Sequence, residues 1–230
     1  MAKKNEAQAP QMESLSKMET FITKYKKVIS IAIIAIVVVV VGGILLNNFY
    51  FQPRQAEAST ALAKGQDYFA QQQYEKALNG DKAGYDGFLK IADKYSCTDA
   101  GNLAHLYAGL SYAALNKWKE AADCLEDYSS ADDAMISPAA EAALGNAYAN
   151  LGKIDDAVDC LKKAADMAND QSINGYNMSL SPSFLLQAGE LLESQGKADK
   201  ALEIYQDIKK NYINSPVYRE IDKYIERCSK

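Results

Sequence analysis

The repeating pattern of this chain is clearest in residues 106–122, LYAGLSYAALNKWKEAA, and in residues 142–158, AALGNAYANLGKIDDAV. Each stretch has glycine in fourth place, tyrosine three residues later and alanine twelve residues after the glycine. The same template fits residues 62–78, LAKGQDYFAQQQYEKAL, and residues 186–202, LQAGELLESQGKADKAL, where leucine replaces the tyrosine. Self-similarity of this kind predicts an array of about four repeated units.

Each unit has the pattern of two packed helices. Two helices approach closely only where small residues meet, so the glycine and the later alanine mark the crossing. A large apolar residue follows sixteen positions after the last three glycines, at Leu125, Leu161 and Tyr205. In the first unit Asp81 stands at that place, and Gly84 with Phe88 fit the template better, which implies about seven extra residues around 79–83.

These residues resemble the tetratricopeptide repeat (TPR) family over about residues 57–213. The resemblance implies an all-α fold, in which helix-turn-helix units stack into a TPR-like superhelix. The glycines are 44, 36 and 44 residues apart, so the units need insertions. One insertion is the polar stretch 169–182, for which we predict a loop. After Pro216 an amphipathic stretch predicts a C-terminal capping helix.

A transmembrane helix is predicted ahead of the array. Residues 28–46, VISIAIIAIVVVVVGGILL, carry no charge, and a helix of this length spans roughly 28 Å, close to the hydrocarbon thickness of a bilayer. The alternative is a cleaved signal peptide. The small-x-small sequence Ala56-Glu57-Ala58 lies too far beyond Leu46 for that reading, so we expect an uncleaved, single-pass anchor.

Lysines before the span predict that the N-terminus is cytoplasmic. We therefore expect four parts: a cytoplasmic tail at 1–27, the transmembrane helix at 28–46, a linker at 47–56 and an extracytoplasmic TPR-like domain at 57–230. Residues 54–230 carry 19 basic and 27 acidic groups, a net charge of −8. An acidic body of this kind argues against nucleic acid as a partner.

We expect no catalytic site, no cofactor and no metal site, and therefore no enzyme. The one histidine, His105, has no nucleophile or carboxylate among its helical neighbours, so a packing role is favoured. The four cysteines lack any CxxC pair. Helix axes 8 to 10 Å apart disfavour a bridge between Cys124 and Cys160, so small buried thiols are expected, although side-chain direction leaves a disulfide open.

With catalysis and nucleic acid binding disfavoured, protein binding is the function that remains. In TPR arrays the first helices line a concave face, and positions three before and one after each glycine tend to point into it. We predict a mostly apolar or neutral partner-binding groove that includes Leu62, Gln66, Phe69, Leu106, Tyr107, Leu110 and Asn146. The alternative is that the packing of the repeats, or the last helix, covers these side chains.

The order of tail, anchor and exported acidic array resembles the bacterial ancillary subunit of the SecYEG translocon, the YfgM-like family. The resemblance implies a bacterial inner-membrane protein with a periplasmic domain that supports protein export. Its protein partners would be translocon subunits, a periplasmic chaperone or a client polypeptide. The alternatives are a structural scaffold for another envelope complex, in cell division or outer-membrane assembly, and a mitochondrial import receptor. The oligomeric state stays open.

Overall fold

The computed structural model describes the backbone of residues 9–229 and the side chains of residues 19–229, so part of the predicted tail at 1–27 lies outside the described residues. Throughout the described range the regular structure is helical, without strands. The chain divides into two compact units, Met1–Pro53 and Arg54–Lys230. The unit boundary therefore lies close to the predicted start of the repeat domain at residue 57.

The first unit is one long helix, α1 (Ala9–Leu46), followed by the π-helical turn η1 (Asn47–Phe51). By its length and composition alone, this helix would be able to cross a membrane. Its apolar side chains are exposed, with Val39 at 74%. The predicted linker 47–56 is helical in the structure, because η1 runs into α2 and Pro53 stands in the first turn, where proline is tolerated.

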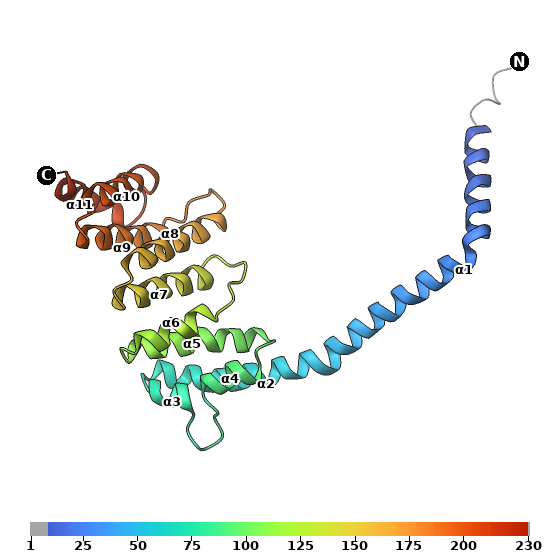
Figure 1. Ribbon diagram of the computed structural model, residues 1–230, viewed down its shortest axis with the longest axis horizontal. Coiled ribbons are helices and arrows are strands. Elements are labelled where there is room, and N and C mark those ends of the chain that lie inside the picture. The colour runs from blue at the N-terminus through green and yellow to red at the C-terminus, as the bar shows by residue number, and fades with distance from the viewer. Residues whose placement is uncertain (1–8, 230) are drawn as a thin grey trace, which may run out of the picture. The chain divides into compact units, whose positions relative to one another are not determined.

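The second unit is a stack of helix pairs (Figure 1). The pairs are α2 (Gln52–Ala70) with α3 (Tyr74–Asn79) and α4 (Phe88–Lys94), α5 (Asp99–Ala114) with α6 (Trp118–Glu126), α7 (Ile136–Asn150) with α8 (Ile154–Asp170), and α9 (Ser181–Ser194) with α10 (Ala198–Asn211). A 3₁₀ turn, η2 (Val217–Arg219), and α11 (Ile221–Cys228) complete it. The all-α superhelix and its capping helix are thus confirmed.

The predicted crossings are present in the structure. An ideal Cβ placed on Gly109 would lie 2.6 Å from Cγ of Leu125. One placed on Gly189 would lie 2.3 Å from Cε1 of Tyr205. The large residue sixteen positions after the glycine therefore packs on the bare backbone of the first helix, where a side chain would hold the helices apart.

The first repeat has the predicted insertion. Its second helix is split into α3 and α4 by a loop at residues 80–87. Phe88 is fully buried, and its Cε1 lies 2.3 Å from the ideal Cβ position of Gly65. Phe88 thus takes the place that Leu125 has in the second repeat, as predicted, while Asp81 lies in the loop. The prediction is wrong for Gly84, which is exposed in the same loop, whereas Ala77 of α3 is fully buried.

The turn inside each repeat is made by one residue in the left-handed region of backbone conformation. Gly152 and Gly196 have φ of 76° and 70°, and Gln72 and Asn116 at the equivalent positions have φ of 59° and 58°. A residue in this conformation ends a helix and reverses the direction of the chain. The last carbonyls of the helix then accept hydrogen bonds from the amides that follow. In the first two repeats this geometry is therefore held by residues with a Cβ, for which it is strained.

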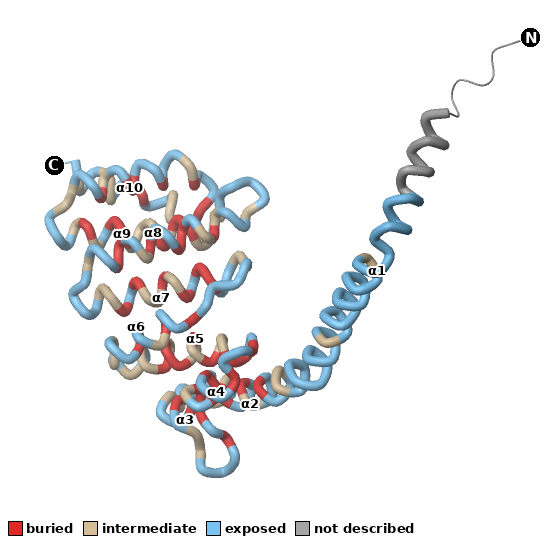
Figure 2. The backbone as a smooth tube through the Cα atoms, turned by 45° about the vertical axis from the view of Figure 1, so that its right-hand side comes forward, coloured by how far each residue is buried: buried red, intermediate tan, exposed pale blue. Residues whose placement is uncertain are grey.

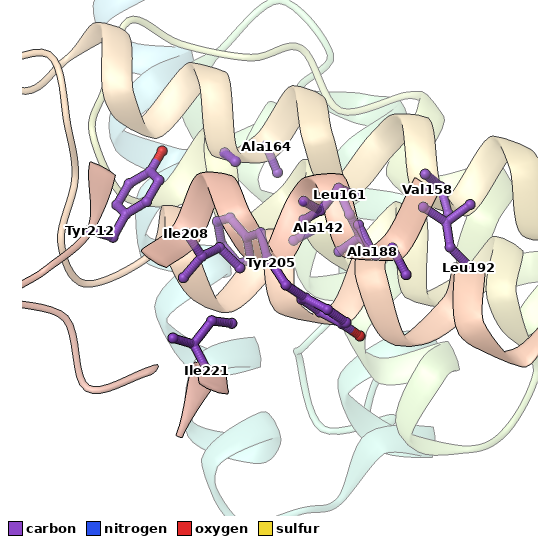
Figure 3. Packing of buried hydrophobic residues seen from close by; sticks show 14 residues of the cluster. Ala142, Val158, Leu161, Ala164, Ala188, Leu192, Tyr205, Ile208, Tyr212 and Ile221 are labelled. Carbon is purple, nitrogen blue, oxygen red and sulfur yellow. The ribbon is translucent and has the colours of Figure 1, made fainter. Parts of the chain in front are cut away.

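Buried residues form a band through every helix pair (Figure 2). The largest cluster joins the third and fourth repeats to the cap, and Figure 3 labels Tyr205, Ile208 and Ile221 among its members. These three side chains are at most 1% exposed. Because α11 adds Ile221 to this core, the apolar end of the last repeat is covered.

The polar insertion is shorter than predicted. Helix α8 continues to Asp170 and α9 begins at Ser181, so the loop comprises residues 171–180 instead of 169–182. Asn169 lies in the last turn of α8, where its Oδ1 accepts hydrogen bonds from the amide of Asn177 and the hydroxyl of Ser181. These bonds join the two ends of the loop and satisfy polar groups that the helix alone leaves free.

Candidate protein-binding surface

The predicted groove residues occupy two different environments in the structure. Leu62 and Leu106, three residues before their glycines, are only 6% and 8% exposed and lie in hydrophobic clusters. Residues three apart on a helix share a face, so these leucines, like the glycines, face the second helix of the pair. In this structure they contribute to the core, while their contact with a partner stays a prediction.

The aromatic residues of the predicted groove pack on one another. The ring of Tyr107 lies 5.4 Å from Phe69 in a T-shaped arrangement and 5.3 Å from Phe88 in a stacked one. These pairs link the first repeat to the second, and such contacts stabilise beyond the area they bury. Phe69 and Tyr107 remain half-buried, so each keeps part of its surface in solvent.

The positions one residue after each glycine remain accessible along the array. Gln66 and Leu110 are half-buried, and Asn146 and Glu190 are exposed. Three of these four side chains are uncharged, and none is basic. A surface of this composition lacks the Lys and Arg donors that capture a terminal carboxylate, while the partner-binding groove itself stays a prediction.

The first repeat has a hollow that was not predicted from the sequence. It has a volume of about 520 Å³ and is lined by Ala56, Glu57, Thr60, Ala61, Lys64, Gly84, Tyr85, Asp86 and Tyr95. Thr60 and Lys64 stand where the second repeat has the buried Ala104 and Ala108. This replacement of apolar by polar residues was the available signal, since the first repeat has no preceding repeat to cover it.

Hydrogen bonds hold the loop of residues 80–87, which contributes Gly84, Tyr85 and Asp86 to the wall of this hollow. Tyr85 donates its hydroxyl to the carbonyl of Ala77 at 2.7 Å, and Asp81 accepts the amides of Ala83 and Tyr85 at 2.7 and 3.0 Å. The hydroxyl of Tyr68 also donates to Asp81 at 2.7 Å. That bond, followed by the two amide bonds, lowers the pKa of Asp81 to about 2.

The lone histidine has one charged neighbour that the sequence did not predict. Nδ1 of His105 lies 3.9 Å from Oδ2 of Asp127, which stands at the end of α6. The side chain of Asp127 is 70% exposed, so the pair lies at the surface and not in a closed site. Among the described residues, no group of three or more His, Cys, Asp or Glu is placed to hold a metal ion.

All four cysteines are free. Cys97 is exposed, whereas Cys124, Cys160 and Cys228 are half-buried, so the expectation of buried thiols does not hold for Cys97. Burial, with nearby carboxylates second, raises the pKa of Cys124 to about 11. Burial and Glu141 raise the pKa of Cys160 to about 12. A thiol that resists ionisation is a poor nucleophile, which gives these two residues no catalytic activation.

Comparison with known proteins agrees with this geometry. Residues 142–216 and 103–131 match sequence models of the tetratricopeptide repeat. No curated protein matches the chain. Two structures of TPR-like repeats, from a protein described as a Podosopora anserina kinesin light chain, resemble it with a TM-score of 0.56 and 13% identity. The similarity covers 76% of this chain and 85% and 86% of theirs, and at this identity it supports the fold alone.

Proposed function

We propose that this protein is a membrane-tethered protein-interaction module of the bacterial envelope, which supports protein export by binding polypeptides or chaperones. The observation that carries the proposal is the combination of one apolar helix, α1, with a stack of tetratricopeptide-like repeats. Repeats of this kind present an extended surface, and protein binding is the function that such a surface supports. The apolar helix would hold this surface beside the membrane.

The chemistry of the accessible surface supports a polypeptide as the bound molecule. Leu110 and Tyr107 offer apolar area, while Gln66 and Asn146 offer amides that can donate to and accept from a peptide backbone. An uncharged surface of this kind does not select one charged sequence. It therefore suits a client or chaperone segment that is recognised by its backbone and by apolar side chains.

The export role is tested by crosslinking in intact membranes. A photoreactive amino acid would replace Leu110 or Asn146, and the matched control would replace Lys162 on the outer face of α8, which is exposed. We expect adducts with translocon subunits, chaperones or nascent chains from the first two positions and none from the third. Recovery of one fixed complex without clients would support the scaffold alternative, and equal adducts from all three positions would reject the surface.

The placement of the array is tested with its own thiol. Cys97 is the exposed cysteine, so a membrane-impermeant maleimide should modify it from the periplasmic side once the outer membrane is opened. The variant Cys97→Ser controls for the slower, half-buried thiols. Labelling only after the inner membrane is disrupted would place the array in the cytoplasm and reject the export role.

A further inference from the structure

The hollow of the first repeat lies on the face of α2 that has no repeat before it. Three alanines occupy the equivalent face of α5, where they pack on the first repeat and are at most 2% exposed: Ala100, Ala104 and Ala108. The corresponding residues of α2, 44 positions earlier, are Ala56, Thr60 and Lys64, and all three are exposed. The face that other repeats use for stacking is therefore polar and open here.

The insertion of the first repeat supplies a second wall. Figure 1 shows this loop, residues 80–87, projecting from the repeat, and its residues Tyr85 and Asp86 line the hollow. The carboxylate of Asp81 accepts two amides of the same loop, at 2.7 and 3.0 Å, and the hydroxyl of Tyr68 on α2. The loop is thereby fixed against α2, so the hollow has an ordered wall and is more than an uncovered helix surface.

Two buried tyrosines complete the lining. Tyr85 and Tyr95 are 4% and 6% exposed, and both border the hollow. The hydroxyl of Tyr95 donates to Oε2 of Glu57 at 3.3 Å, and the guanidinium of Arg54 lies 5.6 Å from the centre of its ring. The exposed carboxylate of Glu57 therefore has a preferred position, which is set by a side chain that cannot move freely.

Opposite charges line the hollow along α2. Glu57 and Lys64 are seven residues apart, which is two helical turns, so they share one face and are separated by about 10.5 Å along the helix axis. Among the described residues, Lys64 has no ion-pair partner. One end of the hollow thus offers an acceptor for a cation, and the other end offers a donor for an anion.

These charges indicate the kind of molecule that fits. A complementary ligand has a positive and a negative group roughly 10 Å apart. The two ends of an extended tripeptide have this separation, because each residue of extended chain spans about 3.3–3.6 Å. The volume of about 520 Å³ lies within the range of roughly 300–1,000 Å³ that is typical of small-ligand sites. The rings of Tyr85 and Tyr95 offer apolar area to the middle of such a peptide.

We infer that the hollow of the first repeat binds short zwitterionic peptides, with the peptide amino group paired to Glu57 and the peptide carboxylate paired to Lys64. This site is separate from the partner-binding groove. Gln66 of the groove is two residues from Lys64, so the two side chains leave α2 about 200° apart. The inference goes beyond the proposed function and does not rest on the membrane span, because all lining residues belong to the second compact unit.

Equilibrium dialysis of the full-length protein in detergent micelles tests the site. The probe is radiolabelled Ala-Ala-Ala with free ends, and it is compared with the N-acetylated and the C-amidated forms of the same peptide. We expect saturable binding of the free tripeptide, with an affinity about fivefold or more above that of either capped form. Each capped form loses one of the two charge-assisted contacts.

Two variants assign each end of the peptide. Lys64→Gln should weaken binding of the free tripeptide about fivefold but leave the affinity for the C-amidated form unchanged, because that form has no carboxylate to pair. Glu57→Gln should do the same with respect to the N-acetylated form. Both residues are exposed, so circular dichroism should not change. The matched controls are Asp67→Asn and Lys76→Gln, exposed charges outside the hollow, which should leave all three affinities unchanged.

The outcomes separate this site from the groove and from indirect effects. Absence of saturable binding at millimolar peptide, or equal binding of the three peptides, would overturn the inference. Equal weakening of free and capped peptides by Lys64→Gln and by Glu57→Gln would also overturn it, since a disturbed structure does not distinguish the ends. If Leu110→Asp abolishes binding and the two hollow variants do not, the peptide occupies the groove, which supports the proposed function and rejects this site.

Discussion

Glu193 on α9 accepts two hydrogen bonds from the guanidinium of Arg227 on α11, at 2.7 Å from Nε and 2.9 Å from Nη2. Sγ of Cys228 donates to the same carboxylate at 3.2 Å. Glu193 is 19% exposed and Arg227 55%, so the pair lies at the rim of the core that α11 covers. It fixes the orientation of the capping helix on the fourth repeat.

Arg227→Ala should loosen the cap. We expect a loss of about 1 kcal/mol in the free energy of unfolding, because a two-point pair is stronger than an ordinary surface pair but is still partly in water. Urea denaturation followed by circular dichroism measures it. The control is Lys223→Ala, which removes an exposed pair with Glu220 at 3.5 Å and should change stability by no more than a few tenths of a kcal/mol.

The effect of Arg227→Ala should depend on pH. Burial is the largest single influence and would by itself raise the pKa of Glu193. The hydrogen bonds to its carboxylate, that from Arg227 foremost, together with the positive charge of Arg227, outweigh burial and leave that pKa below its usual value of 4.5. The stability from this pair is therefore present above pH 4.5 and is lost as the pH falls through the folded pKa. The difference between wild type and Arg227→Ala should therefore shrink as the pH falls below 4.5 and the carboxylate of Glu193 becomes protonated. A constant difference would contradict this account.

Alanine at the crossing glycines should destabilise the repeats to different extents. Gly65→Ala and Gly189→Ala would place a Cβ 2.3 Å or less from Tyr85, Phe88 or Tyr205 and should cost about 1–3 kcal/mol. At Gly145 the nearest atoms are 3.1 Å away. There the gain in helix propensity offsets the crowding, so Gly145→Ala should lie within about 1 kcal/mol of wild type. Thermal unfolding of the three variants tests this order.

Glycine should stabilise the turn of the first repeat. Gln72 has a φ of 59°, and removing its Cβ relieves a strain of roughly 1 kcal/mol. Gln72→Gly should therefore raise the urea midpoint, while Asn116→Gly should raise it less because asparagine tolerates this conformation. The reverse change, Gly152→Ala, should lower the midpoint. If Gln72→Gly instead lowers the urea midpoint, the side chain of Gln72 contributes more stability than its strained backbone conformation costs.

Asp81→Asn should open the loop of residues 80–87. The carboxylate accepts hydrogen bonds from Tyr68, Ala83 and Tyr85, and its pKa of about 2 lies below the usual 3.8. The stabilisation is present above pH 3.8 and is lost as the pH falls toward 2. Limited proteolysis at neutral pH should cut the variant faster than wild type. Asp86→Asn, in the same loop, is the control and should be cut at the wild-type rate.

Thiol modification should separate Cys97 from the other cysteines. At pH 8 the thiolate of Cys124, with a pKa of about 11, is present in only about one molecule in a thousand. Maleimide should modify Cys97 first because it is exposed, and Cys97→Ser should leave only slow reactions. The rate at Cys124 should keep rising with pH up to about 11. Mass spectrometry after timed quenching measures each site, and fast modification of Cys124 at pH 8 would contradict the burial.

Local spacing made the repeats readable from the sequence. A helix places residues three and four apart on one face, so Gly109, Leu125 and their equivalents reveal which surfaces meet. The same spacing rule identified Phe88, and not Asp81, as the large residue that packs at the helix crossing of the first repeat, and the structure confirms this. The apolar run at 28–46 could likewise be recognised as long enough to span a bilayer, because that length is a property of one helix.

The sequence by itself determined the helix pairs, their order and their crossing points, since each depends on residues close together in the chain. Only the tertiary structure decided which of those residues stay accessible. Leu62 and Leu106 are buried in the core, and Arg227 pairs with Glu193 although 34 residues separate them in the sequence. Such contacts depend on how successive helix pairs are rotated and stacked, and the packing of many side chains at once sets that rotation.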